Sequence, residues 1–92
     1  MLKYSLGLDI SSKEIHCCLS TIDNSQKVTI RGSRKIANTI KGFRDLEDWV
    51  IRHRKQKEIP LVICMEATGV YYENCAIYLS KAGFWVSVLL PN

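Results

Sequence analysis

The sequence predicts an α/β domain built on one mixed five-stranded sheet, and three observations lead to that prediction. Apolar runs with strand-like composition recur at residues 3–10, 14–22, 27–36, 60–66 and 84–90. Apolar side chains at helical spacing fill the two long gaps, after residue 39 and after residue 69. Only short turns separate the first three strands. The expected order is β-β-β-α-β-α-β, in a single domain covering residues 1–92.

The first three strands form an expected antiparallel meander. The connection Ser11-Ser12-Lys13 is short enough for a hairpin. A cluster of turn residues, 23–26, then leads into an edge strand in which Val28 and Ile30 alternate with polar neighbours. Gly32 marks an expected β-bulge within that strand.

The two helices have recognisable ends and apolar faces. Thr39 is the expected N-cap of the first helix, which runs to about residue 55. The second helix follows Gly69, and Gly83 fits its C-cap position. The apolar face of the first is expected to carry Ile40, Phe43, Leu46 and Val50, and that of the second Tyr71, Cys75, Tyr78, Leu79 and Ala82.

Two helical crossovers add parallel strands and must be right-handed, and a sheet with strand order 3-2-1-4-5 satisfies both rules. Strands 3–10 and 60–66 then lie side by side at the point where the chain changes direction across the sheet. Ligands bind beyond the carboxyl ends of strands at such a point.

Asp9 and Glu66 close these two strands, each after an otherwise apolar run. A carboxylate in such a place costs free energy unless it is paired, protonated or bound to a cation. Because neighbouring strands lie ~4.8 Å apart, the two could share one or two cations. We therefore predict that Asp9 and Glu66 are metal ligands. The alternative is that Asp9 caps the following turn and Glu66 is a solvated acid.

Several other side chains have two interpretations each. His16 lies in a strand beside two cysteines, which is more typical of a structural residue than of a ligand. Thr68 fits a helix N-cap or a nucleic-acid contact. Tyr71 is expected to pack, whereas Tyr72 could stack on a base. Lys13 is first a turn residue, close enough to the acids to meet a phosphate.

The charge distribution gives a mild indication of a polyanionic partner. The net charge is +4, and residues 31–57 contain nine Lys or Arg but three acids. Arg31, Arg34 and Lys35 on the edge strand are candidate nucleic-acid contacts, or else discourage edge pairing. The four cysteines have no C-x-x-C spacing, which argues against zinc and indicates a reducing, cytoplasmic compartment. No apolar run approaches ~20 residues, so no membrane span is expected.

Two motifs resemble those of a known family. The segment Gly7-Leu8-Asp9-Ile10-Ser11-Ser12-Lys13 resembles the first motif of the DEDD transposases, the insertion-sequence and Piv-type invertase family. Glu66-Ala67-Thr68-Gly69-Val70-Tyr71, followed by Ala82-Gly83 and Pro91-Asn92, resembles the second. The resemblance covers essentially the whole chain.

The resemblance implies a ribonuclease-H-like fold, as the N-terminal part of a RuvC-like catalytic domain truncated after its last strand. Members use four acids, in the order Asp, Glu, Asp, Asp, to hold Mg²⁺ or Mn²⁺ while DNA strands are cleaved and transferred. Only the first two map here, as catalytic residues, onto Asp9 and Glu66, so the fragment alone is expected to be inactive. DNA is the implied partner, with a guide RNA in some members. The expected protein is a homo-oligomer acting at the prokaryotic nucleoid.

Two other classes of function stay open at this point. One is a nucleotide-binding domain of the actin, Hsp70 and sugar-kinase type. Those domains favour a Gly-rich phosphate loop after the first strand, and Ser11-Ser12-Lys13 contains no glycine. The other is a non-catalytic nucleic-acid-binding module, whose binding would ignore Mg²⁺.

Overall fold

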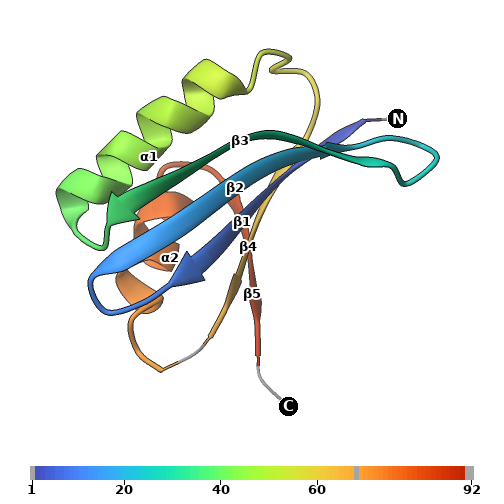
Figure 1. Cartoon of the computed structure of the whole chain (residues 1–92). Coiled ribbons are helices and arrows are strands. Elements are labelled where there is room, and N and C mark those ends of the chain that lie inside the picture. The colour runs from blue at the N-terminus through green and yellow to red at the C-terminus, as the bar shows by residue number, and fades with distance from the viewer. Residues whose placement is uncertain (1, 68, 91–92) are drawn as a thin grey trace.

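The structure, a computed structural model, describes residues 2–67 and 69–90. Its elements in chain order are β1 (Lys3–Ile10), β2 (Glu14–Ile22), β3 (Val28–Ala37), α1 (Ile40–His53), β4 (Leu61–Glu66), α2 (Glu73–Lys81) and β5 (Trp85–Leu89). The strands form one sheet in the order β3-β2-β1-β4-β5 (Figure 1). The β1–β2 and β2–β3 pairs are antiparallel, and the β1–β4 and β4–β5 pairs are parallel. The predicted fold class and strand order are confirmed.

The sheet has one covered and one uncovered face, because side chains alternate along each strand. In β1 the buried positions include Leu6 and Leu8, which pack with α1 and α2 in one core. Both helices therefore lie against the same face, α1 beside β3 and α2 behind the sheet in Figure 1. We call the opposite face, which carries Ser5, Gly7 and Asp9 of β1, the open face.

A β-bulge divides the edge strand β3 close to the predicted position. Leu19 pairs with Gly32 and Ser20 with Ile30, so Arg31 is the extra residue. The bulge breaks the alternation, and Ile30 therefore lies on the open face although Gly32, two residues away, faces α1. Ile30 and Val28 are 69% and 58% exposed, so the apolar side chains in the first half of β3 are not buried.

Helix α1 begins as predicted and ends slightly earlier, at His53. The Thr39 hydroxyl accepts a hydrogen bond from the Gly42 backbone N–H, 3.1 Å away, so Thr39 is the N-cap. Phe43, Leu46 and Val50 of the expected stripe are buried, together with Trp49. Ile40 is 54% exposed, which corrects its assignment to the apolar face. It occupies the first helical position, where the chain has not yet reached the core.

Helix α2 begins later than expected, at Glu73, because residues 69–72 form turns. The delay reverses the expectation for the tyrosines: Tyr71 is exposed, and Tyr72 is half-buried against the core. Ala82 is also exposed, since the helix ends before it. Gly83 has φ +95° directly after the helix, which confirms the left-handed cap position.

Strand β5 closes the sheet with apolar residues on both faces. Val86 and Val88 pack against the core, whereas Trp85 and Leu89 lie on the open face and are 69% and 53% exposed. Pro91 and Asn92, the last residues of the second motif, lie outside the described residues. Within the described part of the chain, neither helix is long and apolar enough to cross a membrane.

Candidate functional site

The site is built on the carboxyl ends of two neighbouring parallel strands. Leu8 of β1 pairs with Met65 of β4, so the next residues, Asp9 and Glu66, lie side by side at the carboxyl ends of these two internal strands. Both side chains are exposed, and both belong to the open face. With strands spaced ~4.8 Å apart, two such carboxylates are close enough to share a cation. The structure thus brings together the two acids that the sequence singled out.

Asp9 and Glu66 line one depression of about 860 Å³ on the open face. Gly7 lies in its middle, and a Cβ atom added there would meet nothing within 4 Å. The cross-strand partners of Gly7 are Cys18 on β2 and Cys64 on β4. Small side chains next to the acids therefore leave room for a ligand above the sheet.

Two further side chains extend the line of acids across the sheet. His16 pairs with Asp9 in the β1–β2 ladder, and Lys35 pairs with His16 in the β2–β3 ladder. Paired residues share a face, and both side chains are exposed and line the depression. Lys35 also forms an exposed ion pair with Glu14, with 3.2 Å between Nζ and Oε2. His16, which the sequence indicated as structural, faces this depression instead of the core.

Asn38 joins the loops at the acid-bearing end of the sheet, a role that the sequence analysis missed. Its Nδ2 donates hydrogen bonds to the carbonyl oxygens of Ser11 (2.9 Å) and Tyr71 (3.1 Å). Its backbone N–H donates to the carbonyl oxygen of Lys13, 2.9 Å away. One side chain therefore connects the turn that follows Asp9 to the loop that follows β4.

The turn between β1 and β2 is closed by Ser11. The Ser11 hydroxyl accepts from the Glu14 backbone N–H, 3.2 Å away, and donates to the Glu14 carbonyl oxygen, 3.0 Å away. Within residues 2–67 and 69–90, no hydrogen bond is made by the Asp9 carboxylate, so Asp9 does not act as the cap of this turn. That side chain is available to a ligand.

The three basic residues grouped on the edge strand do not share a surface. Arg34 borders the main depression but pairs with Cys17, whose side chain is buried on the covered face. There Arg34 lines a second depression with Asp45 and Asp48 of α1. Successive strand residues point to opposite faces, so Lys35 alone of the two adjacent cations belongs to the open face.

The remaining candidate residues lie away from the acids or outside the description. The Nε of Arg31 donates to the buried hydroxyl of Thr21, 3.1 Å away, on the side of the helices. Lys13 is exposed in the hairpin turn but does not line the depression. Tyr72 is half-buried and packs against the core. Thr68 falls outside the described residues.

The donors available to a metal ion are few. In the part of the chain that the structure describes, no cluster of three or more His, Cys, Asp or Glu side chains could hold a metal. Asp9 and Glu66 therefore supply two carboxylate ligands, and the remaining coordination positions of an ion would be filled by water or by groups from elsewhere. Oxygen ligands with retained water are what Mg²⁺ prefers.

Comparison with known proteins identifies the family. A family model described as a transposase, of the DEDD IS110 type, matches residues 6–92. The chain belongs to the DEDD transposase family. This match confirms the resemblance indicated by the segments around Asp9 and Glu66. No curated protein matches this DEDD transposase chain by sequence.

Solved structures similar to the DEDD transposase chain include two resolvases. RuvC of T. thermophilus, in complex with a Holliday junction substrate, has a TM-score of 0.67 and 9% identity, covering 99% of this chain and 66% of that one. The Fowlpox virus resolvase with Holliday junction DNA has a TM-score of 0.63 and 19% identity, covering 97% and 61%. A Ppx/GppA family member of Aquifex aeolicus has a TM-score of 0.54 and 12% identity, covering 99% and 36%. At such identities the likeness shows the fold, and the resolvases confirm its RuvC-like, ribonuclease-H-like class.

The DEDD transposase chain is shorter than the proteins whose structures it resembles. It spans about a third of the Aquifex aeolicus protein and no more than 66% of T. thermophilus RuvC.

Proposed function

We propose that this DEDD transposase chain supplies half of the acidic site of a DNA recombinase, which cleaves and transfers DNA strands during transposition. Asp9 and Glu66 are the first two catalytic acids of that site. The observation that carries the proposal is their position, side by side at the carboxyl ends of β1 and β4 on the open face. The Holliday junction DNA bound by the two similar resolvases supports DNA as the substrate.

Asp9 and Glu66 are the residues that would hold a divalent metal, and their oxygen donors fit Mg²⁺ or Mn²⁺. Held by these residues, such an ion would supply orientation of a nucleophile and neutralisation of charge on the leaving oxygen of a phosphodiester. Asp9 is the central ligand in this proposal, and Glu66, on the neighbouring strand β4, is the second. The open space above Gly7 admits the phosphate group beside the two carboxylates.

In this proposal the site needs two further acids, as in the family's set of four, because the described residues hold no cluster of three or more possible ligands. We therefore expect no DNA cleavage by the 92-residue chain alone, and Mg²⁺-dependent cleavage by that chain would contradict this part. The whole protein works as a homo-oligomer in the prokaryotic cytoplasm, where its DNA substrate is. A guide RNA is a further proposed partner, carried over from the family.

Binding of Mn²⁺ to the purified chain, followed by electron paramagnetic resonance, tests the role of the acids. Asp9→Asn and Glu66→Gln should each weaken Mn²⁺ binding by ~10-fold or more, because a lost ligand costs at least as much as a lost outer-shell partner. Glu58→Gln is the matched control, since Glu58 is an exposed acid that does not line the depression. Equal affinities for all three variants would overturn the proposal.

The same variants separate the two alternative classes of function. A nucleotide-binding domain would bind ATP with saturation, and Asp9→Asn would remove that binding. A non-catalytic module would bind DNA equally well with Mg²⁺ or with a chelator, and Asp9→Asn would leave its affinity unchanged.

A further inference from the structure

The depression has two halves of opposite chemical character. Carboxylates occupy the β1 and β4 half, and the β2 and β3 half presents the imidazole of His16 and the ammonium group of Lys35. We propose that His16 and Lys35 form a phosphate-binding position for one DNA strand, directly beside the acids. This inference rests on the proposed function, because it takes DNA as the ligand of the open face.

The register of the sheet places these groups in one line. Lys35, His16 and Asp9 are successive cross-strand partners, and Glu66 follows on β4. Three strand spacings of ~4.8 Å separate the ends of the line, roughly 14 Å in all. Consecutive phosphates of one strand advance ~3.4 Å along a duplex axis, so the line can face more than one phosphate. A strand that follows it crosses the open face from β3 toward β4.

Electrostatics explains why such a position is needed beside the acids. A phosphodiester is repelled by two carboxylates, and an approach to them becomes favourable only where cations or donors offset that repulsion. Lys35 offers a compact positive charge on a flexible stem, and the His16 ring offers an N–H donor. Contacts of this kind fix the register of a nucleic acid without reading its sequence.

Glu14 is the group that would compete with DNA for Lys35. Its carboxylate lies 3.2 Å from Nζ, and the side chains of Lys35 and Glu14 are 57% and 49% exposed. Exposed ion pairs of this kind contribute little to stability. A phosphate can therefore displace the carboxylate with little loss to the fold.

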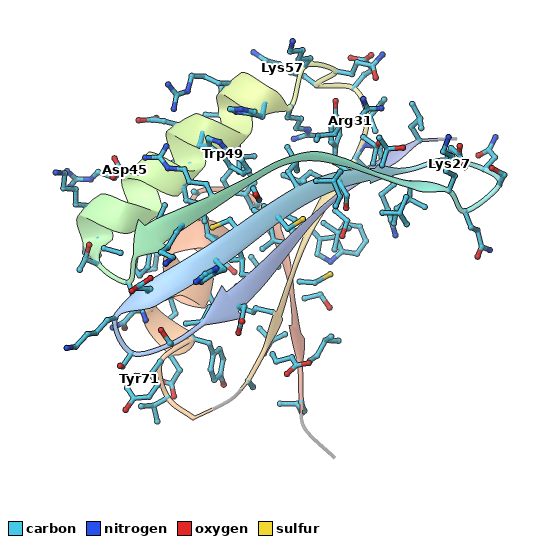
Figure 2. All side chains as sticks on the ribbon, in the orientation of Figure 1. Lys27, Arg31, Asp45, Trp49, Lys57 and Tyr71 are labelled. Carbon is cyan, nitrogen blue, oxygen red and sulfur yellow. The ribbon has the colours of Figure 1, made fainter. Side chains whose placement is uncertain are left out.

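The test measures binding of a short fluorescein-labelled single-stranded DNA to the full chain, by anisotropy in EDTA. The chelator keeps metal ions out of the measurement. Lys35→Met should weaken binding and lower the salt slope by ~0.7, the value for one lost phosphate contact on a single strand. Lys27→Met is the control, with the same charge change at the far tip of the β2–β3 hairpin (Figure 2). It should leave the slope unchanged.

The imidazole is tested by its donor group. His16→Phe should weaken DNA binding, and His16→Gln, which keeps an N–H donor, should retain more of it than His16→Phe does. His16 is exposed, so the fold should survive each change.

A gain of binding provides an independent readout. Glu14→Gln removes the competitor of Lys35 and should tighten binding more than Glu58→Gln, which makes the same charge change elsewhere. Equal effects of Lys35→Met and Lys27→Met, with DNA still bound, would overturn the phosphate position and leave the proposed function standing. No DNA binding by the unaltered chain at low salt would overturn both.

Discussion

At the scale of single residues, Asn38 has the widest reach of any polar side chain around the site. It is half-buried between the hairpin turn and the loop after β4, and it satisfies a carbonyl oxygen in each. Those segments follow the strands that end in Asp9 and Glu66, so Asn38 is, within the proposed site, a positioning residue for the two carboxylates. A group of this kind acts on a metal site through its ligands.

Asn38→Ala should therefore weaken Mn²⁺ binding by ~10-fold, as outer-shell substitutions commonly do. Its backbone bond to Lys13 survives the change, so the urea midpoint should fall only slightly. Asn24→Ala, in the distant β2–β3 turn, is the control for loss of an exposed amide. An unchanged Mn²⁺ affinity in the Asn38 variant would show that the two loops hold their positions without it.

Burial raises the pKa of the thiols of Cys17 and Cys75 from 9.0 to about 12. The folded chain then holds protons that the unfolded chain releases above pH 9. The contribution of these two thiols to folding stability is therefore fully present below pH 9 and is lost as pH rises toward 12. Urea unfolding across that range should show the decrease, and Cys75→Ala should reduce its slope. At pH 8 a thiol reagent should modify the exposed Cys18 first and Cys17 only after unfolding.

At the scale of elements, the start of α1 depends on a close contact between backbones. A Cβ atom at Gly42 would lie 1.8 Å from the carbonyl oxygen of Ala37, at the end of β3. Helix propensity alone would favour Ala over Gly by about 1 kcal/mol. The overlap must move the helix or the strand, and backbone shifts of this kind cost about 1–3 kcal/mol or more.

Gly42→Ala should consequently lower the free energy of unfolding despite its better helix propensity, as measured by urea denaturation. Gly7→Ala is the control in the sheet, because a Cβ there meets open space. If the Gly42 variant is as stable as the unaltered chain, the backbone at Ala37 can move away from the added Cβ atom at no cost, which would contradict this prediction.

The strand patterns allowed most of the fold to be predicted. The structure differs from the prediction where the length of a loop decides at which residue the next helix begins. Strands β1 and β2 have the predicted bounds, since apolar alternation and a short turn define both ends. Which of Tyr71 and Tyr72 is buried could not be predicted, because both residues lie in turns before the helix begins at Glu73, where helical spacing does not apply. Asn38 left no local signal, as its bond to Tyr71 spans 33 residues.

The site was predictable in part for the same reason. The adjacency of Asp9 and Glu66 follows from the strand order alone. His16 could have been found by pairing residues outward from the hairpin turn, which puts it opposite Asp9. Arg34 and Lys35 were grouped by charge, and the period of two along a strand separates them.

At the scale of the whole molecule, the main unusual feature is the exposure of apolar side chains at the β5 end of the open face. Trp85 and Leu89 on the open face, and Leu90 after them, are 69%, 53% and 78% exposed. Large apolar patches seldom stay bare on a monomer. Phe84, Val86 and Val88, the other apolar residues of this segment, are partly buried and pack against the core.

We expect the chain to self-associate through the β5 end of the open face. Sedimentation velocity should show the average mass rising with concentration, and Leu89→Lys should shift the chain toward monomer. Ile51→Lys is the matched control, since Ile51 is also 53% exposed but lies on α1. A single monomeric species at high concentration would contradict this expectation.

The extra residue in β3 has a consequence for how the sequence can change in length. Removing one residue from a strand normally turns everything beyond it over, so that inward side chains point outward. Arg31 already stands outside the alternation, and its deletion would join Gly32 to Ile30 in a regular ladder with both faces kept. The loss would be confined to the bond that its Nε donates to Thr21. Among the residues of this strand, Arg31 is thus the one position where a deletion should be tolerated.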